Sequence, residues 1–299
     1  MRLKQAFCDG IKNLAKEHDN VMLVESDVQS GVREWFLKEV PNQYLDTGIA
    51  ECNAIGICAG LESEGYVPFW YTYGFLVDMV FSQIKQSIAR DNRNVKIFGF
   101  NCGVSIDGKL GGASHNCVED IGLMRLLPGM TIVVPADGSQ LYQSVKAAYE
   151  CKGPVYVRFG AGDFPDIVDN NFKIGKASLL REGKKLTVVC NGIMVSSVLE
   201  TADKYGDIEV LNMSTVKPLD RNTLFKSAIK TGEVAVLEEN YLNGGMGEHI
   251  ARLFGQTDIK IHCLGIKDIW MQSGKGDLRD KYNLDVKSVE EFIRGIIND

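Results

Sequence analysis

The chain has 299 residues, of which 45% are hydrophobic and 24% charged, and its formal net charge at pH 7 is −6. This length suits two domains, and the ordinary globular composition excludes disordered, collagen-like and coiled-coil proteins. There is no run of about 18 uncharged apolar residues and no apolar N-terminal stretch, so we expect neither a membrane protein nor a secreted one. Lysine and arginine are scattered along the chain, so nucleic acid is not expected as a partner.

The eight cysteines contain no Cys-x-x-Cys pair, which is the spacing of zinc ribbons and fingers. Cys52 and Cys58 lie in one apolar run, and the other six are far apart in the sequence. We therefore expect buried free thiols in a reducing cytoplasm, and no metal ligands in this chain.

The first half of the chain alternates apolar strands with helices. The first helix, over 2–16, carries Leu3, Phe7, Ile11 and Leu14 at helical spacing. In chain order, strands are predicted at 21–24, 44–48, 67–71, 95–100, 131–134 and 155–159, and further helices at 50–61, 75–90, 119–126 and 139–149. Strands that are apolar throughout and alternate with helices indicate a parallel sheet covered on both faces.

A second alternation follows a segment rich in glycine, proline and aspartate at 160–169. It predicts strands at 186–190, 209–213, 233–237 and 259–264, and helices at 196–205, 221–231, 247–254 and 288–297. The sequence therefore predicts an α/β protein with two parallel-sheet domains. We place the first domain at 1–165, the linker at 166–182 and the second domain at 183–299.

Glu51 is the first candidate for a functional residue, because ligands of open parallel sheets collect at the carboxyl ends of the strands. It lies in the first turn of a helix that is apolar on nearly every side and is therefore expected to be buried. A lone carboxylate there should be protonated or hydrogen-bonded. Such a group can share a proton with a nitrogen base in catalysis. Alternatively, Glu51 caps the first turn of its own helix.

An aromatic segment follows the next predicted strand. Five of the seven residues at 69–75 are aromatic: Phe69, Trp70, Tyr71, Tyr73 and Phe75. Their rings could form a stacking wall for a flat heterocycle. The alternative is that they pack the core and an interface.

Two further polar residues follow strands. His115 lies in a glycine-rich stretch at 110–116 and is one of only four histidines, so it is a candidate proton carrier or hydroxyl contact. The alternative is a capping or surface histidine. Arg158 lies at the end of an apolar strand, where a guanidinium suits a phosphate or a carboxylate. The alternative for Arg158 is an interdomain salt bridge. The glycines at 244–247 do not complete a dinucleotide motif, because Ile250 occupies its last position.

Taken in order, these segments resemble the C-terminal two-thirds of transketolase, and also the deoxyxylulose-phosphate synthases and the β subunits of 2-oxoacid dehydrogenases. The resemblance covers nearly the whole chain. In the first domain it rests on Gly48-Ile49-Ala50-Glu51, Gly112-Ala113-Ser114-His115 and Pro135-Ala136-Asp137. In the second domain it rests on the segments at 216–220 and 238–247 and on Ser273-Gly274.

The resemblance implies thiamine diphosphate as the cofactor. It assigns to Glu51 the hydrogen bond to N1′ of the aminopyrimidine, which stabilises the imino tautomer that removes the thiazolium C2 proton. An aromatic residue stacks on the pyrimidine, here Phe75 with Tyr73 nearby, although the family's second stacking aromatic could fall on Asp78. Asp27 resembles an acid that lies near the cofactor in the family.

The resemblance also implies the substrate contacts. His115 would contact the reacting hydroxyls of the donor sugar, and Arg158 would bind the sugar phosphate. Two positions depart from the family pattern: Gly111 replaces an acid that contacts the acceptor, and Asn101-Cys102-Gly103 stands where an upstream histidine is expected. We therefore expect a modified or non-standard sugar as the acceptor.

The family motif Gly-Asp-Gly, which binds Mg²⁺ and the diphosphate, is absent from this sequence. The resemblance therefore implies one half of a split transketolase, active only with an N-terminal partner subunit that carries the metal site, in a two-fold heterotetramer. The alternatives are a 2-oxoacid dehydrogenase β subunit or a deoxyxylulose-phosphate-type synthase, both of which release CO2 from a 2-oxoacid, and a non-catalytic subunit that only completes an interface.

Overall fold

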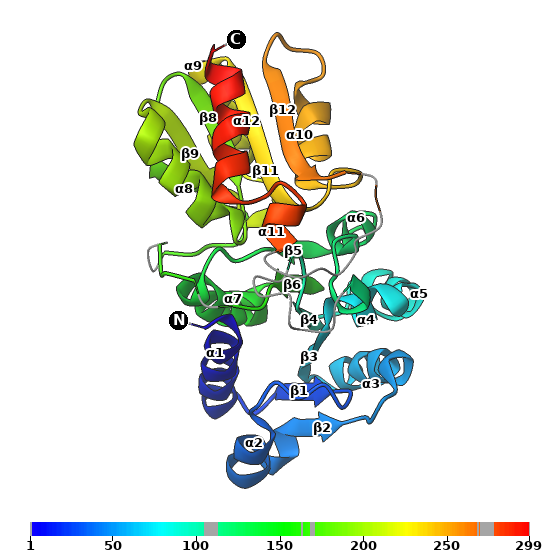
Figure 1. Cartoon of the computed structure of the whole chain (residues 1–299). Helices are drawn as coiled ribbons and strands as arrows, with labels where there is room; N and C mark the ends of the chain where they lie inside the picture. The colour runs from blue at the N-terminus through cyan, green and yellow to red at the C-terminus, as the bar shows by residue number, and fades with distance from the viewer. Residues whose placement is uncertain are drawn as a thin grey trace.

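The computed structural model describes residues 2–104, 113–162, 164–167, 171–267, 269 and 278–298. The chain forms two sheets with helices packed on them, one above the other in Figure 1. Within the described part of the chain, no helix has both the length and the apolar character that crossing a membrane requires.

The first sheet has seven strands in the order β10-β5-β6-β4-β3-β1-β2. Its strands are β1 (Val21–Glu25), β2 (Tyr44–Asp46), β3 (Val67–Tyr73), β4 (Lys96–Phe100), β5 (Thr131–Val133), β6 (Val155–Phe159) and β10 (Thr215–Lys217). All neighbours are parallel except β10, which pairs antiparallel with β5. The sequence analysis did not predict β10, which comes from the second half of the chain and joins the sheet of the first.

Helices cover both faces of this sheet (Figure 1). They are α1 (Leu3–Glu17), α2 (Arg33–Glu39), α3 (Glu51–Ser63), α4 (Gly74–Met79), α5 (Phe81–Gln83), α6 (Asp120–Arg125) and α7 (Gly138–Glu150), with short turns η1 (Pro41–Gln43), η2 (Ile84–Ala89) and η3 (Ala113–His115). The single helix predicted at 75–90 is instead divided into α4, α5 and the π-helical turn η2. Such π-helical turns often occur at functional sites.

The second sheet has five strands in the order β12-β11-β8-β9-β7. Its strands are β7 (Ser178–Arg181), β8 (Leu186–Cys190), β9 (Ile208–Asn212), β11 (Glu233–Tyr241) and β12 (Lys260–Ile266), and its helices are α8 (Met194–Tyr205), α9 (Arg221–Thr231), α10 (Met246–Phe254), α11 (Leu278–Lys281) and α12 (Val286–Asn298). Strand β7, antiparallel to β9, begins inside the segment that we assigned to the linker.

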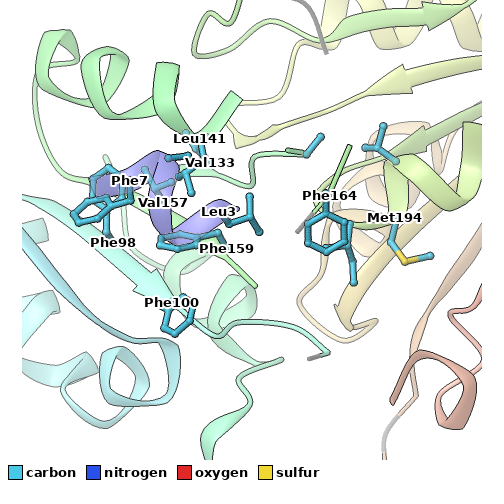
Figure 2. Packing of buried hydrophobic residues seen from close by; sticks show 14 of the residues in the cluster. Leu3, Phe7, Phe98, Phe100, Val133, Leu141, Val157, Phe159, Phe164 and Met194 are labelled. Carbon is cyan, nitrogen blue, oxygen red and sulfur yellow. The ribbon is translucent and has the colours of Figure 1, made fainter. Parts of the chain in front are cut away.

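The core of the first domain forms where α1 packs on the sheet. Figure 2 shows Phe7 of α1 beside Phe98 of β4. The ring centroid of Phe7 lies 5.0 Å from that of Phe98 and 4.9 Å from that of Tyr71, and all three rings are fully buried. Edge and offset packing of such rings adds to the free energy of burying their area. The apolar face of α1 that the sequence predicts thus packs against the aromatic residues of the sheet.

Asp137, in the Pro135-Ala136-Asp137 turn after β5, forms two backbone hydrogen bonds that hold the turn in place. Its carboxylate accepts a hydrogen bond from the backbone N–H of Gln140 at 2.7 Å and so caps α7. The other oxygen accepts the N–H of Ile167 at 2.8 Å, in the segment that leads to the second domain. One buried carboxylate therefore fixes both the start of a helix and the course of the connection between the domains.

Lys96 is an unusual residue for the interior of a parallel sheet. Its side chain is fully buried, and its Nζ donates to Asn94 Oδ1 at 2.7 Å and to the carbonyls of Cys151 at 2.7 Å and Gly153 at 2.8 Å. Burial lowers the pKa of Lys96 from 10.5 to about 7. The two carbonyls hold the start of β4 against the turn before β6.

We predict that Lys96→Met lowers the free energy of unfolding by about 1–3 kcal/mol, because two buried carbonyls lose their donor. Between about pH 7 and 10.5, the unfolded chain binds a proton at Lys96 that the folded chain lacks. Wild-type stability relative to the variant should therefore rise with pH across this window. Urea denaturation at several pH values measures it, with the exposed Lys85→Met as the control. A difference that does not change with pH would contradict the prediction.

Candidate active site

The predicted site residues follow neighbouring strands of the first sheet. Asp27 follows β1, Glu51 follows β2, Tyr73 ends β3, and Phe75 is in the helix after it. Because these strands are parallel, their carboxyl ends lie at one edge of the sheet. The topology therefore brings to one edge residues that the sequence keeps apart.

Glu51 is the first residue of α3, and only 7% of its surface is exposed. Among the described residues, its carboxyl group forms no hydrogen bond and no ion pair, so it does not cap its own helix. Its carboxyl oxygens are not among the fully buried atoms without a partner, so they remain open to a ligand at the sheet edge. The hydrogen bond of Glu51 to a cofactor stays a prediction.

The prediction that α3 is buried on nearly every side is wrong for this chain. Only one face packs on the sheet, through Ala54, Ile55 and Cys58. The opposite face is exposed at Cys52, Asn53, Gly56 and Gly60, and Ile49, directly before the helix, is 81% exposed. The apolar composition of α3 therefore reflects a surface that this chain does not cover by itself.

Three rings form a cluster at the carboxyl end of β3. The ring of Phe75 lies 4.9 Å from His115 and 5.9 Å from Tyr73, and Tyr73 lies 6.0 Å from His115. All three are half-buried. His115 Nδ1 is 3.0 Å from the hydroxyl of Ser114. The structure thus brings His115 to the aromatic residues that the resemblance places against the pyrimidine.

Asp27 lies at the same edge but is exposed. It adopts a left-handed backbone conformation with φ of 58°, and its N–H donates to Asp46 Oδ1 at 3.2 Å. Within the described part of the chain its carboxyl group has no hydrogen bond or ion pair, and its role near the cofactor stays a prediction.

Asp78 lies one helical turn after Phe75, at the position considered for a second aromatic residue. The thiol of Cys117 donates to Asp78 Oδ2 at 2.9 Å. Burial, and after it the charge of Asp120, raises the pKa of Asp78 to about 8, so its carboxyl group is mostly protonated at neutral pH. Residue type alone did not reveal this neutral acid beside the ring cluster, because its protonation depends on burial.

The contact of Arg158 with a sugar phosphate stays a prediction, and in this structure the side chain already has partners. Its guanidinium is fully buried, with Nε 2.8 Å from Asp120 Oδ2 and Nη1 4.0 Å from Glu239 Oε1. Asp120 also accepts the hydroxyl of Tyr156 at 2.7 Å. Asp120, in α6, belongs to the same domain as Arg158, whereas Glu239, in β11, belongs to the second domain. The longer contact, to Glu239, is therefore an interdomain ion pair of the kind that the alternative interpretation expects.

Glu239 is a residue of this region to which the sequence analysis gave no role of its own. It is buried, and burial raises its pKa to about 7, although the charge of Arg158 lowers it. The sequence feature that could have identified Glu239 is its place in the pair Glu238-Glu239, directly after an apolar strand segment. Gly111, Gly112 and the Ser273-Gly274 turn, all used in the resemblance, lie outside the described residues.

Comparison with known proteins agrees with this geometry. The family model for the transketolase pyrimidine binding domain matches residues 1–165, and the model for the transketolase C-terminal domain matches residues 175–289. The chain belongs to the transketolase family. The expected family and the two-domain α/β fold class are thereby confirmed.

Two relatives are parts of transketolases. Over 298 residues the chain is 34% identical to the 6-deoxy-6-sulfo-D-fructose transketolase subunit SqwH of Clostridium sp. (strain MSTE9), covering 96% of this chain and 92% of that one. Over 305 residues it is 33% identical to an apulose-4-phosphate transketolase subunit of Phocaeicola vulgatus, covering 97% of each.

A solved structure described as a split gene transketolase, inactive beta4 tetramer, matches with a TM-score of 0.89 at 31% identity. The match covers 100% of this chain and 98% of that chain. The present chain is therefore a transketolase subunit, a transferase that corresponds to the C-terminal part of a split transketolase.

The buried ion pair of this transketolase subunit gives a stability prediction. Asp120→Asn leaves the cation of Arg158 without its close partner, and Arg158→Met leaves the acid unpaired, so each variant should lose about 3–5 kcal/mol of unfolding free energy. The double variant should lose less than the sum of the two, because neither charge then remains buried alone. Urea denaturation of the three variants tests this, and strictly additive losses would contradict it.

Proposed function

We propose that this chain catalyses the transfer of a two-carbon ketol unit from a ketose phosphate to an aldose, with an active site shared with an N-terminal partner subunit. The observation that carries the proposal is Glu51, a mostly buried residue whose carboxyl group has no partner among the described residues, at the sheet edge where the ring cluster lies. The transketolase relatives support the reaction class.

The residues at this edge fit the pyrimidine half of thiamine diphosphate, which supplies a carbon nucleophile when bound. Glu51 would hold a proton at its carboxyl oxygen against the pyrimidine nitrogen, and its burial strengthens that hydrogen bond. Phe75 would stack on the ring, with Tyr73 beside it. His115, which contacts Phe75, would bind the hydroxyl groups of the donor sugar and move a proton there.

The described residues do not fit a magnesium site. One group of three close potential ligands exists among them, and it contains the thiol of Cys117 with Asp78 and Glu119. Mg²⁺ prefers oxygen ligands in near-octahedral geometry, which a thiol does not provide. We therefore place the Mg²⁺ and diphosphate site on the partner subunit.

The exposed face of α3 is the surface that we assign to the partner assembly. Its exposed residues are small, apart from Asn53, and the exposed Ile49 lies directly before it, so a chain packed there would cover this surface and exclude water from Glu51. We propose a two-fold heterotetramer. A reducing cytoplasm fits the eight cysteines, all of which are free.

We predict that Glu51→Gln lowers ketol transfer by at least about a thousandfold, because an amide cannot hold the proton that the carboxyl shares with the cofactor. The chain would be co-expressed with the product of the neighbouring gene and assayed with thiamine diphosphate and Mg²⁺. Binding of thiamine diphosphate is measured on the same samples.

The matched control is Glu64→Gln, an exposed glutamate after the other end of α3, which should leave activity unchanged. Full activity of Glu51→Gln would contradict the proposal and indicate a non-catalytic subunit that only completes an interface. Release of CO2 from a 2-oxoacid donor would instead identify a synthase or a dehydrogenase component.

We propose that the acceptor is a modified sugar. The names of two relatives specify modified ketoses, a sulfo-fructose and apulose 4-phosphate, and removal of the two-carbon ketol unit from a sulfo-fructose leaves a sulfo-aldose, which is the acceptor of the reverse reaction. In this chain Arg158, the phosphate ligand expected from the sequence, is enclosed by Asp120. We predict at least about a tenfold higher kcat/KM for a modified aldose of this kind than for ribose 5-phosphate. A panel of aldoses with one ketose donor measures it, and equal turnover of xylulose 5-phosphate with ribose 5-phosphate would contradict it.

A further inference from the structure

His115 lies in the segment at 114–118, which is hydrogen-bonded to the segment at 101–104. The N–H of Gly103 donates to the carbonyl of Cys117 at 2.6 Å, and the side-chain amide of Asn116 donates to the carbonyl of Gly103 at 3.1 Å. The buried amide of Asn101 donates to the carbonyl of His115 itself at 2.8 Å. The place of His115 therefore depends on how the segments at 101–104 and 114–118 are held.

Glu239 reaches these segments from the second domain. Its Oε2 accepts the backbone N–H of Val104 at 3.2 Å. Gly103 packs directly against the same carboxyl group, and with φ of 72° it has a backbone conformation that disfavours any side chain. A methyl group at Gly103 would collide with the Glu239 carboxyl. The close approach of the two domains at this point thus requires both residues.

The end of β11 makes two more connections to the same region. The Nη1 of Arg158 lies 4.0 Å from Glu239, and the Nη2 of Arg158 donates to the carbonyl of Cys117 at 3.4 Å. The backbone N–H of Tyr241 donates to the carbonyl of Val118 at 2.9 Å. The second domain therefore contacts both segments, one through Val104 and the other through Cys117 and Val118.

We propose that Glu239 is a positioning residue for His115, which it places by holding the segments at 101–104 and 114–118 from the second domain. The assignment of His115 to sugar binding rests on the proposed function, but the positioning does not. The feature that Glu239 supplies is an acceptor oxygen for Val104, which the carboxyl group keeps whether it is protonated or ionised. Gly192, in the second domain, packs against the same carboxyl group, because a Cβ atom there would lie 2.9 Å from Glu239 Oε1.

Glu238 provides a matched control on the same strand. It is equally buried, but its carboxyl group accepts the N–H groups of Met246 at 2.6 Å and Gly247 at 2.9 Å, at the start of α10. Removing it should loosen α10 and leave the segments around His115 intact.

The test is hydrogen exchange followed by mass spectrometry on the full chain, without cofactor or partner. Glu239→Ala should speed exchange at least about tenfold in the segments at 101–104 and 114–118, while Glu239→Gln, which keeps the acceptor oxygen, should restore protection to within about threefold of wild type. Glu238→Ala should speed exchange at Met246 and Gly247 only. If Glu239→Ala exchanges like Glu238→Ala around His115, or if Glu239→Gln gives no rescue, the positioning role is refuted.

Gly103→Ala tests the same contact from the first domain and keeps the proposal falsifiable if Glu239→Ala does not fold. It should loosen the same two segments, and unchanged protection there would overturn the proposal. In the two-subunit enzyme, Glu239→Ala should lower kcat at least about tenfold, with rescue by Glu239→Gln. If no ketol transfer is found for the wild type, the proposed function fails while the exchange result still decides the positioning.

Discussion

The junction of the two domains depends on one buried cation. Arg158 has no exposed surface, and a guanidinium removed from water is tolerated only where acids compensate its charge. Its acids come from both domains, Asp120 at 2.8 Å and Glu239 at 4.0 Å. Separating the domains would remove Glu239 from Arg158 and leave only Asp120, from the first domain, to compensate the cation. The relative position of the two sheets is therefore set by charge as well as by apolar packing.

Backbone pairing reinforces the same junction. Strand β10 belongs to the second half of the chain but pairs with β5 of the first sheet. Lys217, at its end, donates to the carbonyls of Arg125 at 3.0 Å and Leu127 at 2.5 Å. Arg125 in turn donates to the carbonyl of Gly245 at 2.6 Å, in the turn before α10. Helix α6 is thus fixed between the two domains, and it carries Asp120, the partner of Arg158.

The sequence predicted most of the fold because the central strands are buried on both faces and read as continuous apolar runs. It missed β7 and β10, since a short strand at the edge of a sheet carries little apolar signal. It predicted α3 correctly as an apolar helix but wrongly as one that is covered on nearly every side. Composition cannot tell whether the covering surface belongs to the same chain, and here one face of α3 stays exposed.

For the candidate site, the sequence predicted the surroundings of some residues better than those of others. Tyr73, Phe75 and His115 came together because each follows a parallel strand, so topology alone places them at one edge. Arg158 carried the same local signal, yet its guanidinium is enclosed. The difference lies in Asp120 and Glu239, which are remote in sequence. A residue at a strand end is thus a candidate for ligand binding only until its tertiary partners are known.

Arg158 and Glu51 differ in whether this chain supplies their polar partners, and this difference is what a shared active site requires. Both are buried ionisable groups near the carboxyl edge of one sheet, but Arg158 has its compensating acids inside the chain, whereas Glu51 has no polar partner among the described residues. The chain thus satisfies the charge that holds its domains together. Within the described ranges it provides no polar partner for Glu51, which begins a helix with one exposed face. Such an asymmetry is expected where folding is completed by one polypeptide and catalysis needs a second.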